Sequence, residues 1–144
     1  MLNYIVIAVV AYLIGSISFS IIFTKKFAGF DVREKGSGNA GSTNMLRSVG
    51  KGAAALTLLC DVLKGVVAVA IGLLIGEMVK ADANTRAILV EIAGAFVIIG
   101  HTFPIFFGFK GGKGVATALG VLLITNWRIG LICLVFALII MAVF

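Results

Sequence analysis

The stretch Glu34–Gly52, EKGSGNAGSTNMLRSVGKG, gathers glycines, hydroxyl side chains and amide side chains in a chain that is otherwise mostly apolar. Glycine allows backbone N–H groups to turn toward an oxyanion because no Cβ stands in the way. Arg47 follows these residues, and its guanidinium fork suits a phosphate. This combination predicts a binding site for a phosphate-like anion.

A second glycine-rich stretch, GFKGGKGVAT, runs from Gly108 to Thr117 and carries Lys113. Each stretch leads into a segment expected to be helical, whose first turn offers free N–H groups and the positive end of a dipole. A flexible connector is the alternative interpretation of either stretch alone. Two such loops, each with a basic residue near a helix start, favour one shared anion site.

Two nucleotide-binding interpretations fit poorly. Residues 36–41 match the string GxGxxG, and Asp61 falls near the position of a ribose-binding acid, but no strand precedes the glycines and Asp61 lies in an apolar segment. The second loop departs from a Walker A motif because Phe107 replaces its first glycine and Gly114 replaces the magnesium-binding hydroxyl.

The composition places these loops in a membrane protein. Of 144 residues, 61% are hydrophobic, and the mean hydropathy is +1.19, whereas a soluble domain is about 45–50% apolar. We therefore expect residues 1–144 to form a single all-α membrane domain, a polytopic helix bundle. The net charge of +6 forms no polar platform suited to nucleic acid. Cys60 and Cys133 lie in apolar runs without a CxxC pair, so we expect packing rather than a disulfide or a metal site.

About five membrane segments are expected from the hydropathy pattern. They are Leu2–Phe23, Gly52–Ile75, Arg86–Phe107, Val115–Thr125 and Gly130–Phe144. Pro104 should kink or end the third segment. Asp61 and Lys64 are three residues apart on the second, so we expect them to pair with each other and to serve mainly structure.

The basic residues predict an orientation. With the N-terminus outside, the inner loops hold eight basic residues and the outer turns hold three, so both glycine-rich loops should face the cytoplasm. The inner set is Lys25, Lys26, Arg33, Lys35, Arg47, Lys51, Lys110 and Lys113, and the outer set is Lys80, Arg86 and Arg128.

The strings GSGNAGSTN, followed by Arg47, and GHTFPIFFGFKGGKGVAT resemble the first two signature motifs of the bacterial membrane acyl-phosphate:glycerol-3-phosphate acyltransferases, the PlsY-type family. AYLIGSISFS and DVLKG resemble its early helices, so the resemblance covers nearly the whole chain. Ser42 stands where the family usually has Ala, which is a small-for-small change.

The resemblance implies a reaction in phospholipid biosynthesis. The family transfers a fatty acyl group from acyl phosphate to the sn-1 hydroxyl of glycerol 3-phosphate, giving lysophosphatidic acid and phosphate without a metal or organic cofactor. It implies a multi-pass protein of the bacterial cytoplasmic (inner) membrane, and an enzyme that makes acyl phosphate as a candidate partner. The alternative is a non-enzymatic membrane carrier for phosphate or an organic phosphate. A carrier would predict inverted repeats, which the five segments lack.

The resemblance also assigns site residues. Ser37, Arg47 and Lys113 match the catalytic residues that hold glycerol 3-phosphate, and Gly38, Thr43 and Gly111 match the acyl-phosphate nest. The substrate-binding set expected here is Gly38, Asn39, Gly41, Thr43, Asn44, His101, Lys110, Gly111, Gly112 and Gly114. His101 is open to two interpretations, an intramembrane histidine hydrogen-bonded near the loop or a base that reaches Ser37.

The length of the family carries one further expectation. Its members have about seven membrane segments, each of roughly 20 apolar residues, and a third motif after the fifth. The resemblance therefore implies that this chain is the N-terminal part of a longer protein. On its own, it would be inactive because one wall of the site is absent.

Overall fold

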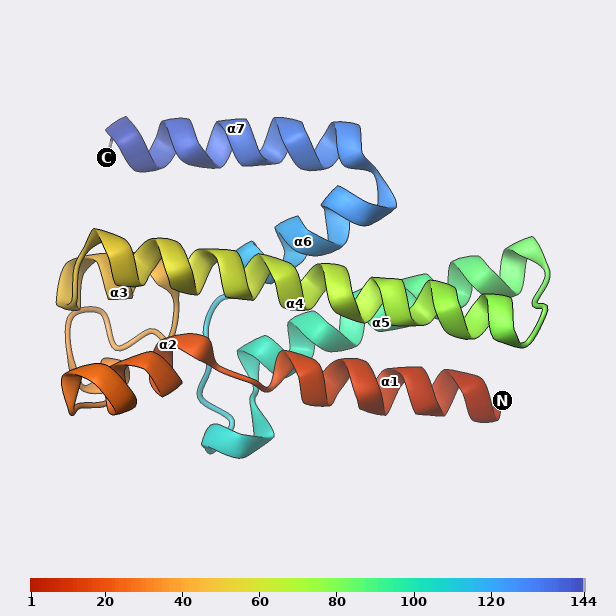
Figure 1. Cartoon of the computed structure of the whole chain (residues 1–144), viewed down its shortest axis with the longest axis horizontal. Helices are drawn as coiled ribbons and strands as arrows, with labels where there is room; N and C mark the ends of the chain where they lie inside the picture. Colours follow the sequence, from red (N-terminus) through yellow and green to blue (C-terminus); the bar gives the residue numbers. More distant parts are fainter. Residues whose placement is uncertain (144) are drawn as a thin grey trace.

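The computed structural model describes residues 1–143, and every regular element in that range is helical (Figure 1). The expected α class is therefore confirmed. The helices are α1 (Leu2–Gly15), α2 (Phe19–Phe23), α3 (Ser42–Ser48), α4 (Lys51–Met78), α5 (Ala83–Thr102), α6 (Val115–Thr125) and α7 (Trp127–Val143).

Three stretches are long and apolar enough to cross a membrane, namely Leu2–Ala28, Lys51–Met78 and Ala83–Phe107. Helices α6 and α7 are apolar but shorter. Helix α6 has the bounds expected from the sequence, whereas α7 begins at Trp127, before the predicted Gly130. The predicted end of that segment, Phe144, lies outside the described residues.

The first apolar run differs from the single helix that its hydropathy suggests. Helix α1 ends at Gly15, α2 begins at Phe19, and a π-helical turn over Thr24–Ala28 follows. The carbonyls of Gly15 and Ile17 accept hydrogen bonds from the Lys64 ammonium, at 3.1 and 2.9 Å. A distant side chain thus satisfies backbone groups that the break leaves without helical partners, as a nonpolar environment requires.

Glycines allow the long helices to approach closely. A Cβ on Gly15 of α1 would meet the Val97 carbonyl of α5, and one on Gly100 would meet the Tyr12 carbonyl. Likewise, a Cβ on Gly65 of α4 would strike the backbone of α6. Small residues are the usual means of close helix packing in membranes, where water supplies no hydrophobic drive between helices.

Two apolar cores result. One joins α1, α4 and α5 through six buried residues: Ile7, Ala11, Ala68, Leu89, Ala93 and Val97. The other lies beneath the first glycine-rich loop and consists of Ile21, Val32, Ala40, Met45 and Ala54. The second core gives the loop a fixed base, because Val32, just before the loop, and Ala40, within it, are both completely buried.

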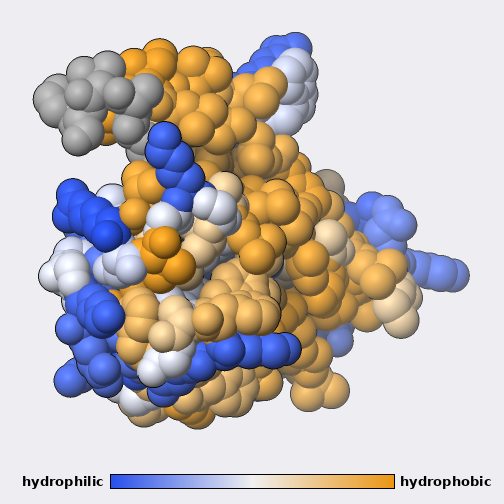
Figure 2. Space-filling view, turned by 60° about the vertical axis from the view of Figure 1, so that its left-hand side comes forward, coloured by the Kyte–Doolittle hydropathy of each residue, from blue (hydrophilic) through white to orange (hydrophobic). Residues whose placement is uncertain are grey.

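The N-terminus and the turn between α4 and α5 lie at one end of the molecule, and the loop before α3 lies at the other (Figure 1). Figure 2 shows most of the visible hydrophilic residues at the end that carries this loop, with further ones at the top and right of the view, and mainly hydrophobic side chains over the helices between them. The fold therefore separates a polar loop face from an apolar helical body.

Candidate active site

The first glycine-rich loop is shaped by one side chain. Asn44, which is buried at 1% exposure, donates from Nδ2 to the carbonyls of Val32 and Lys35, at 2.9 and 3.0 Å. Its Oδ1 accepts the N–H of Ser37 at 2.9 Å. Asn44 was predicted to bind substrate, and that role stays a prediction. In this structure its amide binds the loop backbone.

The second loop folds back onto the end of α5. Helix α5 ends at Thr102, so Pro104 follows the end of the third helix as expected. The N–H groups of Gly111 and Gly112 donate to the carbonyls of Thr102 and His101, each at 3.1 Å. A Cβ on either glycine would collide with His101 or with its backbone. Both glycines therefore serve close packing, and the Gly111 N–H, predicted to line a nest, already has a partner.

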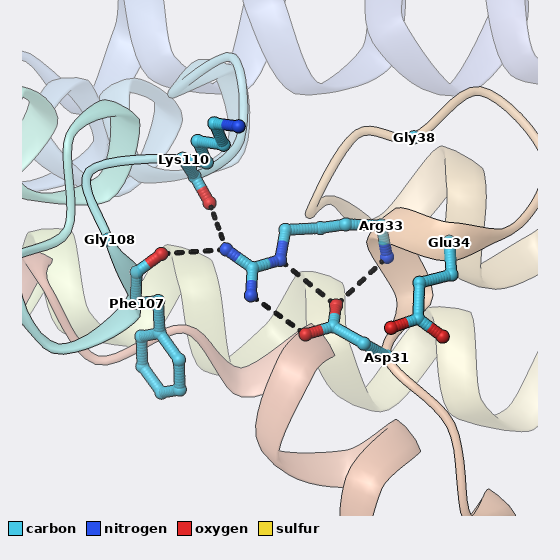
Figure 3. Close-up of a pocket in the computed structure, with 7 residues that line it drawn as sticks. All are labelled: Asp31, Arg33, Glu34, Gly38, Phe107, Gly108 and Lys110. Atoms are coloured by element: carbon cyan, nitrogen blue, oxygen red, sulfur yellow. Dashed lines mark hydrogen bonds and ion pairs between the residues drawn. The ribbon is translucent and has the colours of Figure 1, made fainter.

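Arg33 joins the two loops, a contact that the sequence analysis missed (Figure 3). Its Nη1 donates to the carbonyls of Phe107 and Lys110, at 2.6 and 3.2 Å. Its Nε and Nη2 bind Asp31 Oδ1 and Oδ2, at 3.0 and 2.7 Å. The only signal in the sequence is an acid two residues before a base, which is too common to single out.

Asp31 is the anchor of this arrangement. Besides Arg33, the Lys25 ammonium lies 3.3 Å from Asp31 Oδ2. The hydrogen bonds from Arg33 hold the pKa of the Asp31 carboxyl well below its usual range, against a smaller opposite effect of burial. Asp31 therefore stays ionised across the physiological pH range.

A polar notch of about 90 Å³ lies between the start of α3, the start of α6 and the buried middle of α4. It is lined by Asn39, Gly41, Ser42, Thr43, Asp61, His101, Lys113, Gly114, Val115 and Ala116. Since one water occupies about 30 Å³ in the liquid, the notch suits a small polar group such as a phosphate. It brings together six of the predicted residues: Asn39, Gly41, Thr43, His101, Lys113 and Gly114.

The start of α6 supplies donors to the notch. Gly114 precedes the helix in the left-handed conformation, at φ 77°, and no side chain caps the first turn. The N–H groups of a helix's first turn have no intrahelical acceptors, and both Val115 and Ala116 line the notch. The first turn of α6 therefore offers an anion free N–H donors, whereas the N–H groups of Gly111 and Gly112 already donate to carbonyls of α5.

An apolar groove of about 680 Å³ adjoins the notch. The two share Ser42, Thr43 and the residues from Lys113 to Ala116 as lining. Beyond them the groove is lined by apolar side chains of four helices, among them Leu58 of α4, Ile98 of α5, Leu119 of α6 and Phe136 of α7. A ligand with a polar head and a long apolar tail would fit the two together.

The remaining predicted residues lie elsewhere. Ser37 and Arg47 are exposed and line neither the notch nor the groove. Gly38 and Lys110 line a separate cavity of about 500 Å³ beside Arg33. Among the residues that the structure describes, neither Arg47 nor Lys113 forms an ion pair, so both cations are available to an anionic ligand.

A buried charge cluster forms the floor of the notch. The Lys64 ammonium lies 2.9 Å from Asp61 Oδ1, which confirms the predicted pair. His101 Nδ1 lies 3.5 Å from the same oxygen, and all three side chains are at most 5% exposed. His101 is therefore packed between Asp61 and Gly112. His101 thus lies near the loop, but Nδ1 and Asp61 Oδ1 lack an aligned hydrogen bond within the described residues, and both interpretations of His101 stay predictions.

The chain matches known proteins along most of its length. The family model described as glycerol-3-phosphate acyltransferase matches residues 5–144. The glycerol-3-phosphate acyltransferase of Clostridioides difficile is 50% identical over 141 residues, which are 98% of this chain and 68% of that protein. The corresponding protein of Neisseria meningitidis serogroup C is 50% identical over 124 residues, 86% of this chain and 60% of that one.

Two solved structures share the fold. PlsY, an integral membrane glycerol 3-phosphate acyltransferase, superposes in its glycerol 3-phosphate form with a TM-score of 0.75 at 38% identity. Its lysophosphatidic acid form gives a TM-score of 0.72 at 36% identity. Both matches cover 90% of this chain and 60% of PlsY, so the chain spans roughly two thirds of its relatives' length or less. The chain belongs to the glycerol-3-phosphate acyltransferase family.

Proposed function

We propose that this chain forms the phosphate-binding part of an enzyme that transfers a fatty acyl group from acyl phosphate to the sn-1 hydroxyl of glycerol 3-phosphate. The observation that carries the proposal is the junction of the polar notch with the apolar groove. Acyl phosphate has a phosphate head and a long apolar tail, and the product, lysophosphatidic acid, has the same character. The glycerol 3-phosphate and lysophosphatidic acid forms of PlsY support this assignment.

The acyl-phosphate head would lie in the notch. Lys113 and the free N–H groups at the start of α6 would face its oxygens, and the tail would follow the groove between α6 and α7. Thr43 belongs to the lining of both spaces, where its hydroxyl could meet the carbonyl that joins head and tail. N–H and hydroxyl donors at that point would stabilise the negative charge that develops on the carbonyl oxygen.

Glycerol 3-phosphate would approach from the exposed side of the loops. Ser37 and Arg47 stand there on the first loop and on α3, and Lys113 stands on the second. Arg47 can bind a phosphate with two parallel hydrogen bonds. Such positioning of two substrates turns a bimolecular step into an effectively unimolecular one.

The reaction balances without a redox partner. The sn-1 hydroxyl oxygen attacks the acyl carbon, an ester C–O bond forms, and the bond between that carbon and the phosphate oxygen breaks. Inorganic phosphate leaves, and a phosphate oxygen takes the hydroxyl proton. Because phosphate is a good leaving group, positioning and charge neutralisation supply most of the rate, and His101 need not act as the base.

The site would face the cytoplasm of a bacterial inner membrane, with the N-terminus outside. The excess of basic residues on the loop side supports this orientation. Single cysteines at Lys26 and Gly108 should react with an impermeant thiol reagent only from the cytoplasmic side, and a cysteine at Asp82 only from the outside, in a background without Cys60 and Cys133. The reverse pattern would refute the orientation.

The activity is tested with two preparations in membranes, the chain itself and a chimera that continues it with the remaining third of the C. difficile relative. Both are supplied with acyl phosphate and labelled glycerol 3-phosphate, with acyl-CoA in place of acyl phosphate as the control. We expect labelled lysophosphatidic acid from the chimera and only with acyl phosphate. Uptake of label into vesicles without product would favour a carrier and overturn the proposal.

A further inference from the structure

Each of the two glycine-rich loops is held by its own hydrogen bonds, and few hydrogen bonds join one loop to the other. The first is held by Asn44 and its buried base, and the second by hydrogen bonds to the end of α5. Within residues 1–143, three hydrogen bonds join the segment before α3 to the segment between α5 and α6. One is a long backbone contact of 3.4 Å between the Ala40 N–H and the Gly111 carbonyl, and Arg33 makes the other two.

Arg33 is suited to this junction by its shape. One edge of the guanidinium binds both oxygens of Asp31, and Nη1 turns to the carbonyls of Phe107 and Lys110 (Figure 3). The two carbonyls belong to a tight turn in which Gly108 and Phe109 both have positive φ, at 67° and 59°. Arg33 thus binds the second loop at a turn that contains two residues of positive φ.

We propose that Arg33, anchored by Asp31, is a positioning residue that sets the separation of the two loops. The catalytic consequence rests on the proposed function, because Ser37 and Arg47 come from one side of the junction and Lys113 from the other. Arg33 itself donates to the Asp31 carboxylate and to the carbonyls of Phe107 and Lys110. Its loss would let each loop keep its own fold while the two walls of the phosphate site move relative to each other.

Lysine would not replace Arg33. An ammonium is a point charge that can face the Asp31 carboxylate or the two carbonyls, whereas the planar fork reaches all of them at once. Lys25 already lies at Asp31 Oδ2, but its side chain is 55% exposed and makes no hydrogen bond to the second loop among the described contacts. The clamp therefore depends on the guanidinium and not on positive charge alone.

A distance measurement tests the clamp without reference to activity. Spin labels at Glu34 and Phe106, both exposed, report the separation of the loops in this chain reconstituted in nanodiscs. We expect one narrow distance distribution for the unaltered loops, and a broadened or shifted one in Arg33→Gln and Arg33→Lys. Lys26→Gln is the matched control, since Lys26 is a neighbouring cation in no ion pair of the described residues. If Arg33→Gln fails to fold, Asp31→Asn serves as the second variant.

Kinetics of the chimera test the catalytic consequence. A misplacement of about 1 Å can reduce a rate by roughly 10²-fold, and here it falls on residues that bind one substrate from two walls. We expect the KM for glycerol 3-phosphate to rise roughly tenfold in Arg33→Lys, with a smaller change in kcat and no change in the Tm.

The outcomes separate the two proposals. An unchanged distance distribution in both Arg33 variants overturns the clamp, whatever the activity. A broadened distribution with unchanged KM and kcat overturns the positioning role. A broadened distribution in the Arg33 variants, together with no lysophosphatidic acid from the unaltered chimera, supports the clamp and overturns the proposed function.

Discussion

Arg33 and Lys64 are held in the same way in two different surroundings. In each case a carboxylate a few residues away fixes the cation, and the cation donates to two backbone carbonyls far along the chain. Arg33 does this in a polar loop at the surface, with Phe107 and Lys110. Lys64 does it inside α4, with Gly15 and Ile17 at the break between α1 and α2.

The two contacts differ in whether water can take the place of the cation. Water can solvate the Phe107 and Lys110 carbonyls if Arg33 withdraws. Lys64 is only 4% exposed and Asp61 only 2%, so water cannot readily take the place of the Lys64 ammonium at the Asp61 carboxylate or at the carbonyls of the helix break. One device thus serves two purposes, fine placement of loops where water is present and integrity of the fold where it is absent.

The largest effect should follow from Lys64→Met. The substitution removes the ammonium beside the buried Asp61 carboxylate and leaves only His101 Nδ1 nearby, at 3.5 Å. Breaking a buried pair in this way typically costs about 3–5 kcal/mol. The substitution also removes the donor to the carbonyls of Gly15 and Ile17. We expect little or no monodisperse protein in detergent, measured by size-exclusion chromatography of a fluorescent fusion.

The double variant Asp61→Leu with Lys64→Met separates those two causes. Replacement of a whole buried pair by apolar residues is often neutral. Here we expect only partial recovery of folded protein, because the carbonyls at the helix break stay unsatisfied. Full recovery would mean that the pair merely neutralises itself and that the comparison with Arg33 is wrong.

The next largest effects should come from Arg47 and Lys113, neither of which has a carboxylate partner in the described residues. Hydrogen bonds to charged groups contribute about 1.5–3 kcal/mol, so Lys113→Ala should reduce kcat/KM roughly tenfold to a hundredfold. Arg47→Lys should also impair turnover because a point charge cannot replace the fork. Steady-state assays of the chimera with varied glycerol 3-phosphate provide the measurement.

Folding provides the contrast with Lys64. Lys113→Ala and Arg47→Lys should leave the yield of folded protein unchanged, since both side chains are exposed. Lys110→Ala should have a milder kinetic effect than Lys113→Ala, because Lys110 lines the cavity beside Arg33 and not the notch. Wild-type kinetics in both Lys113→Ala and Arg47→Lys would remove these cations from the phosphate site.

The buried cluster could be predicted from the sequence and the clamp could not. Asp61 and Lys64 stand out because ionisable residues are rare within an apolar helix, and a spacing of three places them on one face. Asp31 and Arg33 lie in a loop rich in charges, where no periodicity fixes a direction. The carbonyls that Arg33 binds in the second loop are 74 and 77 residues away along the chain. Because every residue has a backbone carbonyl, the residue types at these positions do not reveal the contact.

Similar limits apply to the glycines and amides of the motifs. Their composition predicted an anion site, and the notch does gather Asn39, Thr43 and Lys113. Composition could not show that the Asn44 amide and the Gly111 N–H are taken up within the fold. The same donors suit a ligand or a carbonyl of the chain, and only tertiary structure decides between them.

A smaller effect is expected from Asp31→Asn. The amide keeps one acceptor for Arg33 but loses the charge, so the KM for glycerol 3-phosphate should rise less than in Arg33→Gln. Because the pKa of Asp31 is lowered in the folded state, its contribution is complete above the unfolded value of about 3.9 and is lost only as the pH falls below it. The loop distance of the unaltered clamp should therefore stay constant from pH 8 to pH 5, roughly. A change of that distance within this interval would contradict the ionised clamp.

The smallest effect should come from a third cation of the same design. Arg86 Nη1 lies 3.4 Å from Glu77 Oε1, and Arg86 Nε donates to the Ala81 carbonyl at 3.1 Å, in the turn between α4 and α5. Both side chains are exposed, at 42% and 69%, and exposed pairs contribute about 0–1 kcal/mol. We therefore expect Glu77→Gln to leave both the Tm and the kinetics unchanged. As a control, salt at roughly 0.5 M screens the same pair in the unaltered protein and should also leave both unchanged. If Glu77→Gln caused a loss of folded protein comparable to that of Lys64→Met, burial would not set the strength of these contacts. The exposed pair Arg86–Glu77 and the buried pair Lys64–Asp61 would then contribute equally to folding.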